Sequence, residues 1–284
     1  MHPMFWPAFA IAEQIRINEM FSCFIAHHDK TFEFPGETHN FWECVCVLEG
    51  SICVSADERI YNLSAGNIIF HKPMELHKFH VTENRDAYLF IFSFSAEGPL
   101  CKYFRDKVFT LSDEQQAMLT QMIQYMDKKL AQLNITVERN REDQYLQPFS
   151  KIPTYSQTVL TYLYQFMLSL ADDSKIMCVS QSQDSLIFAQ AVSYMNSRIC
   201  DNPSVYEIAA YVSLSATGLK RIFKYYTGMG VHKYFLMLKL KAATEMLSGG
   251  MPVTEVAQTL GFSSQGYFTN VFKRELGILP SSLY

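Results

Sequence analysis

The chain has 284 residues, of which 49% are hydrophobic and 18% charged, so it can bury a substantial core, and its length favours two domains over one. The longest apolar runs, at 5–12 and 159–171, are too short or too often interrupted by polar residues or proline to span a bilayer, and no basic leader precedes the first. The seven cysteines have no regular spacing, which excludes a disulfide framework and a zinc-finger pattern. We therefore expect a cytoplasmic protein with no membrane partner.

The net charge of −4 is unevenly divided along the chain. Residues 184–284 carry nine Lys or Arg and six Asp or Glu, a net charge of +3, which leaves residues 1–183 with −7. Because positive charge attracts polyanions, the C-terminal third is the part of the chain that is compatible with nucleic acid.

Residues 15–95 have the pattern of an antiparallel β domain. Runs rich in β-branched and aromatic residues, at 41–55, 58–71 and 86–95, are separated by Gly, Asn and Pro. Short strands at this spacing predict a small barrel or sandwich.

Two helices are predicted after the β region. Residues 111–133 begin with a Ser112/Gln115 capping-box pattern and continue with Leu and Met at helical spacing, which is typical of an amphipathic helix. Its apolar stripe would form either a dimer interface or the contact with its own barrel. After a polar loop, a second helix is expected at 155–171, and the weakly periodic residues 172–184 are expected to hold the interdomain linker.

The C-terminal segment contains an internal repeat. Residues 207–229 ("EIAAYVSLSATGLKRIFKYYTGM") return at 255–278 ("EVAQTLGFSSQGYFTNVFKRELGI") with matching apolar positions. Each copy predicts a short helix, a short turn and a second helix that begins after an N-cap serine, Ser215 or Ser264. This is the arrangement of a helix-turn-helix motif.

The second helix of each copy has a polar outer side. If its apolar side packs on the first helix, the polar side projects from the body and fits a major groove, where hydrogen-bonding side chains read base edges. Any solvated helix has polar residues on its outer side, but the presence of two copies favours the DNA-reading interpretation. The projecting residues are Thr217, Lys220, Arg221 and Lys224 in the first copy and Gln265, Gly266, Thr269, Asn270 and Lys273 in the second.

Residues 231–250 are expected to form one long helix that ends at two glycines. About 16 helical residues at roughly 1.5 Å each span about 24 Å. This length is sufficient to place two recognition helices in successive major grooves, which lie about 34 Å apart. A single chain would then read one bipartite promoter or operator site on double-stranded DNA.

The C-terminal segment with the two helix-turn-helix copies resembles the AraC/XylS family of transcription regulators. The resemblance covers residues 184–284 and rests on "LKRIFKYYTGM", on "VTEVAQTLGFSSQGYFTNVFKRELGILP" and on the closing Tyr284. It implies seven helices, a homodimer, a small-molecule effector and contact with RNA polymerase. Gly266 stands where the family usually has a longer side chain, so the second copy is expected to read DNA more weakly. The resemblance assigns base or phosphate contacts to Thr217, Lys220, Arg221, Gln265, Gly266, Thr269 and Asn270.

Residues 34–50 and 65–79 resemble the two characteristic segments of a cupin barrel. The first keeps the spacing Glu37-x-His39-x3-Glu43, with Glu37 where a histidine is usual, and the second contains His77. Strand alternation places His39 and Glu43 on one face, which His77 can join from the neighbouring segment. We therefore expect a ligand pocket that involves His39, Phe41, Glu43 and His77.

His39, Glu43 and His77 also form a credible metal set, because imidazole and carboxylate are common metal ligands. Sensor cupins often keep these positions without a metal, and a buried His or Glu can instead be hydrogen-bonded or contact a polar ligand. A metal is therefore possible but not favoured, and no cofactor is expected. Trp42 and the many phenylalanines are expected to form core rather than a ligand platform.

The predicted fold class is α+β, with an N-terminal cupin-like β-barrel and accessory helices, followed by an all-α domain with two helix-turn-helix motifs. The expected boundaries are 1–108 for the sensing barrel, 109–172 for accessory and dimerisation helices, 173–184 for the linker and 185–284 for the DNA-binding domain. The predicted function is a sequence-specific DNA-binding transcription regulator that is controlled by a small molecule and has no catalytic residues. The alternatives are a metal-dependent cupin enzyme and a redox sensor that uses Cys44 and Cys46, each fused to a DNA-binding domain.

Overall fold

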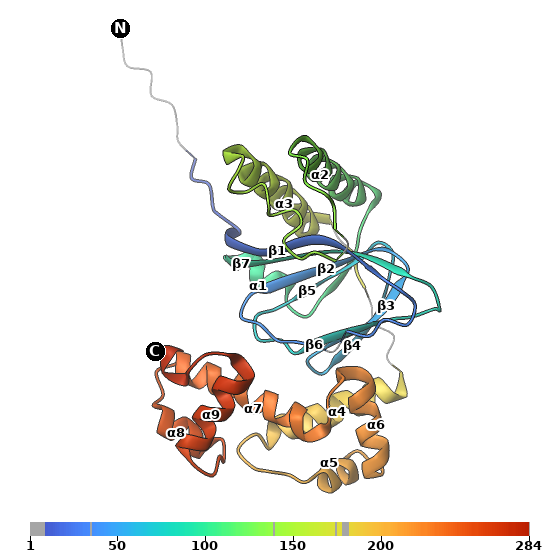
Figure 1. The fold of residues 1–284 in the computed structure, drawn as a ribbon. Helices are drawn as coiled ribbons and strands as arrows, with labels where there is room; N and C mark the ends of the chain where they lie inside the picture. The colour runs from blue at the N-terminus through green and yellow to red at the C-terminus, as the bar shows by residue number, and fades with distance from the viewer. Residues whose placement is uncertain (1–8, 35, 139, 174, 178–181, 284) are drawn as a thin grey trace.

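The computed structural model describes residues 9–34, 36–138, 140–173, 175–177 and 182–283 (Figure 1). Its N-terminal half contains two antiparallel sheets, as the β-rich runs predict. The larger sheet has the strand order β1 (Arg16–His28), β7 (Ala87–Glu97), β2 (Trp42–Glu49), β5 (Asn67–His71), β8 (Val108–Thr110) and β9 (Lys175–Ile176). The smaller sheet has the order β4 (Arg59–Ser64), β3 (Ser51–Ala56) and β6 (His77–Val81).

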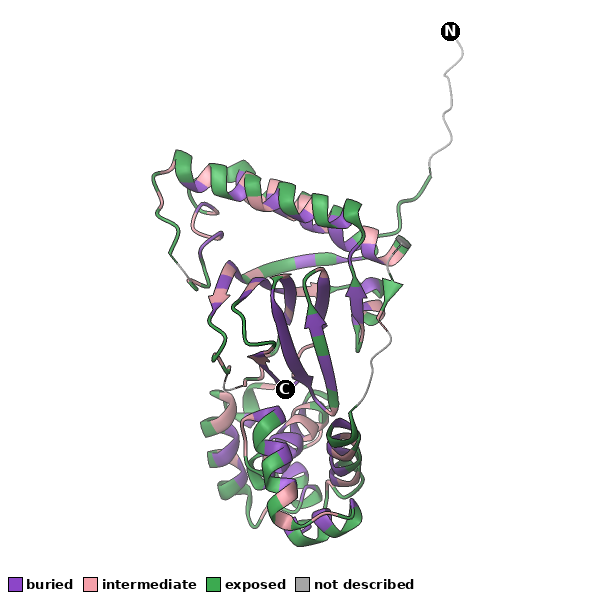
Figure 2. Ribbon diagram, turned by 90° about the vertical axis from the view of Figure 1, so that its right-hand side faces the viewer, coloured by how far each residue is buried: buried purple, intermediate pink, exposed green. Residues whose placement is uncertain are grey.

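Strand β2 separates two apolar cores, because successive side chains of a strand point to opposite faces. Val45 and Val47 pack between the two sheets. Cys44 and Cys46 point the other way and pack on the outer face of the larger sheet. The middle of the larger sheet is therefore buried on both faces, and Figure 2 shows its strands mostly in purple.

Helices α1 (Pro99–Phe104), α2 (Asp113–Gln132) and α3 (Pro153–Asp173) follow, and α2 and α3 cover the outer face of the larger sheet (Figure 1). Helix α2 begins at the predicted capping box between Ser112 and Gln115. Within the described ranges, no helix combines the length and the hydropathy that crossing a membrane requires. The buried part of the α2 stripe packs inside its own domain and is thus not a free dimer surface: Leu119, Met122, Met126 and Leu130.

The segment expected as a linker, 173–184, is only partly a linker. Lys175 and Ile176 form β9, which pairs with β8 at the edge of the larger sheet, and α4 begins at Gln183. Both residues of β9, Lys175 and Ile176, are exposed, and two residues are too few to show the alternation of a strand. The sequence pattern therefore could not indicate this strand.

The C-terminal domain is all-α, as predicted. In residues 182–283 the seven helices implied by the resemblance are found as six α-helices and one 3₁₀ helix. They are α4 (Gln183–Ser197), α5 (Val205–Tyr211), α6 (Ala216–Thr227), α7 (Val231–Ser248), α8 (Val253–Thr259), α9 (Gln265–Leu276) and η1 (Pro280–Leu283).

The internal repeat of the sequence is also a repeat of backbone geometry. Between α5 and α6, Ser213 has a φ of 56°, and at the equivalent place between α8 and α9, Gly261 has a φ of 67°. A backbone hydrogen bond of 2.9 Å closes each turn: the N–H of Leu214 donates to the carbonyl oxygen of Ala209, and the N–H of Phe262 donates to that of Ala257. A Cβ atom at Gly261 would lie 2.7 Å from the carbonyl oxygen of Cys200, so the second turn requires glycine, whereas the first accepts serine.

The smaller sheet rests directly on the helical domain (Figure 1). The Tyr234 hydroxyl of α7 donates to the carbonyl oxygen of Asp57 (3.0 Å), and Lys241 Nζ lies 2.6 Å from Asp57 Oδ2. Three side chains of the smaller-sheet side also belong to the apolar core of the helical domain: Cys53, Ile60 and Leu76. The two domains therefore share apolar and polar contacts.

Candidate DNA-reading surface and ligand pocket

The first recognition helix, α6, presents the predicted polar residues to solvent. Its apolar side is buried in the domain, and a glycine in the left-handed conformation, Gly228, ends it. Lys224 Nζ donates to the carbonyl oxygen of Gly228 (2.7 Å), whereas Lys220 and Arg221 take part in none of the ion pairs found among the described residues. The exposed predicted residues are Thr217, Lys220, Arg221 and Lys224.

The second recognition helix, α9, has fewer available cations. Gln265, Gly266, Asn270 and Lys273 are exposed and Thr269 is half-buried. The Gln265 side chain accepts a hydrogen bond from the Thr254 hydroxyl of α8 (2.8 Å), and Arg274, which lies outside the predicted set, pairs with Glu275 at 2.7 Å. Among the described residues, α9 thus offers Lys273 as its one cation without a carboxylate partner, against three such cations on α6.

The two recognition helices lie toward opposite ends of the helical domain, with α7 between them (Figure 1). Helix α7 has 18 residues, which at roughly 1.5 Å per residue is about 27 Å. Each recognition helix packs on the short helix that precedes it, α5 or α8, as a helix-turn-helix motif requires.

A cavity of 410 Å³ lies in the N-terminal domain. Glu37, His39 and Glu43 form a polar end of the cavity, and further polar lining comes from Ser22, His28, Ser93, Asn140 and Glu142. Its apolar wall is built from six phenylalanines: Phe21, Phe24, Phe32, Phe34, Phe41 and Phe79. Two of these rings, Phe24 and Phe79, also belong to the apolar core between the two sheets, and Phe32 and Phe34 pack against it. Trp42 is buried in the core on the helix side of the larger sheet.

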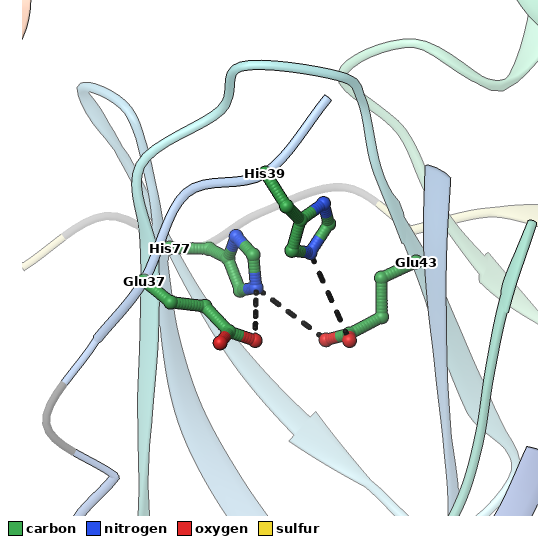
Figure 3. Close-up of side chains that lie close together, drawn as sticks. All are labelled: Glu37, His39, Glu43 and His77. Carbon is green, nitrogen blue, oxygen red and sulfur yellow. Dashed lines mark ion pairs between the residues drawn. The ribbon is translucent and has the colours of Figure 1, made fainter. Parts of the chain in front are cut away.

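Four side chains meet at the polar end of this cavity and are called here the carboxylate–imidazole cluster: Glu37, His39, Glu43 and His77 (Figure 3). His39 lies just before β2, Glu43 lies in it, and His77 opens β6. Glu37 comes from the segment that pairs with His77 through a backbone bridge. The predicted trio of His39, Glu43 and His77 is thus brought together, and Glu37 joins it. The cupin spacing had identified Glu37 as a replacement for histidine but not as a site residue.

The imidazole rings are oriented by their Nδ1 atoms. His39 Nδ1 lies 2.9 Å from the carbonyl oxygen of Phe41, and His77 Nδ1 lies 3.1 Å from that of Glu75. Each Nε2 atom is buried and faces the carboxylates without a hydrogen-bond partner. The separations are 3.4 Å from His77 Nε2 to Glu43 Oε1, 3.6 Å from His77 Nε2 to Glu37 Oε1, and 3.8 Å from His39 Nε2 to Glu43 Oε2.

The surroundings act in opposite directions on the two imidazole rings of the cluster. Burial disfavours a charged ring at His77, but Glu37 and Glu43 outweigh it and raise the pKa of His77 to about 10. Burial and the neighbouring His77 lower the pKa of His39. Behind the cluster, the His71 ring stacks on that of His77 with centroids 4.2 Å apart, and His71 Nδ1 lies 2.6 Å from Glu75 Oε1.

The cysteines predicted as an alternative redox site are poorly suited to it. Cys44 and Cys46 are buried as free thiols on the helix side of the larger sheet. Burial raises the pKa of Cys46 to about 12 and that of Cys44 well above its usual range. Because the thiolate is the reactive form, both thiols should be inert near neutral pH.

The sequence also matches known domain families and proteins. The model of an AraC-like ligand-binding domain matches residues 21–99, and that of a helix-turn-helix domain matches residues 208–283. YidL of Escherichia coli, named as an uncharacterized HTH-type transcriptional regulator, is 25% identical over 256 residues, which cover 86% of this chain and 75% of that protein. The HTH-type transcriptional activator RhaS of Enterobacter sp. is 24% identical over 267 residues, which cover 88% of this chain and 87% of RhaS.

Among solved structures, ToxT from Vibrio cholerae is 13% identical and aligns over 95% of this chain and 96% of its own, with a TM-score of 0.37. The two family matches fall on the two domains of the structure and together cover more than half of the chain. The sequence relatives are named as transcription regulators. The chain therefore belongs to the AraC/XylS family of transcription regulators, with a ligand-binding domain followed by a helix-turn-helix DNA-binding domain.

Proposed function

We propose that α6 makes the main DNA contacts, through Thr217, Lys220 and Arg221, and that α9 adds weaker ones through Gln265, Thr269 and Asn270. The observation that supports this most is the pair of exposed cations on α6, Lys220 and Arg221, which have no carboxylate partner in the described chain. Phosphate and base contacts are made by cations of this kind. The two helices would read the two halves of one bipartite site.

The test is the affinity of Arg221→Ala for a duplex selected from a random pool by the full-length protein. If Arg221 reads a base, affinity for the selected duplex should fall by about 1–3 kcal/mol and specificity at one position should relax. If it contacts phosphate, affinity should fall about equally for selected and unrelated duplexes. The exposed Lys128 of α2 supplies the control, since Lys128→Ala removes a cation away from both helices. Unchanged affinity and specificity in Arg221→Ala would contradict the assignment.

We further propose that the 410 Å³ cavity binds the small-molecule effector, and that the domain binds this molecule without converting it. Six phenylalanine rings together with several polar side chains favour an effector with an apolar body and polar groups. Denaturing the purified protein should release such a molecule, which mass spectrometry would detect. If none co-purifies, a library of amines, acids and sugars with apolar substituents should contain a compound that raises the unfolding temperature. No release and no shift across the library would contradict the proposal, and turnover of a bound compound would favour the enzyme alternative.

A homodimer and contact with RNA polymerase stay predictions from the family resemblance, and a cytoplasmic location stays a prediction from the apolar runs and the cysteine pattern. The buried stripe of α2 is not available for dimerisation, so a dimer would have to use another surface. Sedimentation of the full-length protein at several concentrations would show whether a dimer forms.

A further inference from the structure

The 410 Å³ cavity has more carboxylates than cationic groups in its lining. The lining residues within the described chain include no lysine and no arginine. Carboxylates line the cavity at three positions: Glu37, Glu43 and Glu142. The positive charge that these carboxylates attract can therefore come only from histidine or from a bound molecule.

The basic residues that adjoin this lining in the sequence bind other partners. Lys78, next to His77, donates from Nζ to the carbonyl oxygen of Tyr225 in α6 (3.0 Å). Arg141, next to Glu142, is paired with two carboxylates of its own loop. Neither of these two cations lines the cavity.

Histidine balances one of the three carboxylates. The ring of His77 lies between Glu37 and Glu43, and its pKa of about 10 keeps it protonated near neutral pH. Burial lowers the pKa of His39, and it lowers that of His28 to about 4, so both of these rings are neutral. Three carboxylates against one imidazolium leave an excess of two negative charges, and a neutral His77 would make the excess larger.

The unused hydrogen-bonding capacity of the lining is mainly that of acceptors. The hydroxyls of Ser22 and Ser93 bond to each other (2.7 Å), and the Asn140 side chain makes two hydrogen bonds with the backbone of His27 (2.7 and 3.1 Å). In the neutral ring of His39, Nδ1 donates to a backbone carbonyl, so Nε2 is an acceptor and has no partner. A ligand in this cavity must therefore supply the donors.

The acceptors are close enough together to bind one nitrogen. His39 Nε2 and Glu43 Oε2 lie 3.8 Å apart, so a single nitrogen can lie about 2.8 Å from both, which is the length of a charge-assisted hydrogen bond. A side-chain oxygen of Glu37 lies within 4.8 Å of a ring nitrogen of His39 and of an oxygen of Glu43. A protonated amine supplies both the N–H donors and the positive charge that this group of acceptors lacks.

The apolar wall of the cavity begins directly beside these acceptors. The ring of Phe41 stacks on that of His39, with centroids 4.0 Å apart, and on that of Phe21, with centroids 4.3 Å apart. Phe34 stacks on Phe79 in the same wall. A carboxylic acid would be repelled by the carboxylates, and a sugar would leave the phenylalanine rings without an apolar partner. The lining thus suits a molecule whose charged nitrogen adjoins an apolar body.

We infer that the effector bound in this cavity is an organic cation, a protonated amine on an apolar body, and that its N–H groups bond to Glu37, His39 and Glu43. The inference rests on the proposed effector-binding function of the cavity and names the chemical class of the molecule. The carboxylates select the amine, and the phenylalanine rings select its apolar body.

Calorimetric titration of the full-length, chelator-treated protein in phosphate buffer tests this class with matched compounds. The panel has two bodies, phenylethyl and naphthylethyl, each carrying an amine, a hydroxyl or a carboxylate. For a body that binds, the amine should bind at least about tenfold more tightly than the alcohol, because hydrogen bonds between charged groups are stronger than those of a neutral hydroxyl. The acid should bind more weakly than the alcohol. An alcohol or acid that binds as tightly as its amine would overturn the inference.

Glu37→Gln removes one of the carboxylates while it keeps the size of the side chain. Glu37 is 45% exposed, so the variant should keep the fold, and thermal unfolding checks this. The variant should bind the amine at least about fivefold more weakly and the alcohol within about twofold of the wild type. Equal losses for the amine and the alcohol would contradict selection by charge.

Glu49→Gln is the matched control. Glu49 is exposed at the other end of strand β2 from Glu43, and it does not line the cavity. Because solvent and salt screen a distant exposed charge, this variant should bind the amine within about twofold of the wild type. A loss of amine binding equal to that of Glu37→Gln would overturn the proposed contact.

Failure of the proposed function gives a different result from failure of this inference. If no compound of the panel binds and no molecule is released from the purified protein, the cavity is not an effector site, and the inference fails with it. A released molecule should contain a basic nitrogen. Release of an acid or a neutral compound would keep the cavity as an effector site and overturn the inferred class.

Discussion

Replacing Gly261 with serine tests whether the second helix-turn-helix turn needs a backbone that only glycine adopts easily. At a φ of 67° a residue with a side chain costs about 1–2 kcal/mol. The new Cβ would lie 2.7 Å from the carbonyl oxygen of Cys200, and relieving such a contact by backbone movement costs about 1–3 kcal/mol more. The variant should therefore lose about 2–5 kcal/mol of stability, which for a domain of about 100 residues lowers the midpoint of unfolding by at least about 8 °C.

Scanning calorimetry of the full-length protein measures this loss, and the chain supplies two controls. Gly266→Ser makes the same change at a helical position where a Cβ meets no atom within 4 Å. Ser213→Gly makes the reverse change at the equivalent turn of the first copy. Both should stay within about 1 kcal/mol of the wild type. The reasoning is refuted if the unfolding temperature of Gly261→Ser is no lower than that of Gly266→Ser.

Two further predictions concern buried polar groups. Lys239 Nζ donates to the carbonyl oxygen of Leu260 (2.6 Å) and to Asn202 Oδ1 (2.8 Å). Lys239→Met should therefore lower the free energy of unfolding, measured in urea, by about 1–3 kcal/mol. A loss no larger than that of Lys128→Met would contradict this. Burial raises the pKa of Cys46 to about 12, so native protein at pH 8 should be alkylated at the exposed Cys200 and not at Cys46. Mass-spectrometric detection of Cys46 labelling before Cys200 labelling would restore the redox-sensor alternative.

The helical domain was largely predictable because its sequence repeats itself. Ser215 and Ser264 each cap a recognition helix by accepting from the backbone N–H three residues later. Local signals of this kind depend only on residues close together in the chain. The same holds for the capping box that begins α2 at Ser112. The two-residue strand β9 carries no such signal, so the pattern placed a linker there.

The site was predictable only in part. The spacing of His39, Glu43 and His77 was sufficient to predict that they meet, because they lie in two recognisable segments. His39 itself lies before β2, so strand alternation does not account for its position. The phenylalanine wall was missed because an aromatic residue gives the same sequence pattern whether it faces a core or a cavity. The contacts between domains, such as Tyr234 with Asp57, join residues 177 positions apart, and no local pattern records such a pairing.

The strand β9 sets how far the two domains can separate. Ile176 is held in the larger sheet and Gln183 begins α4, so seven peptide steps of at most about 3.6 Å limit the gap to about 25 Å. A released DNA-binding domain would stay near the smaller sheet at an effective concentration of about millimolar order. Each contact between the domains can therefore be weak, and the domains can still be docked for most of the time. A change of about 1.4 kcal/mol in the free energy of docking shifts the ratio of docked to released protein tenfold.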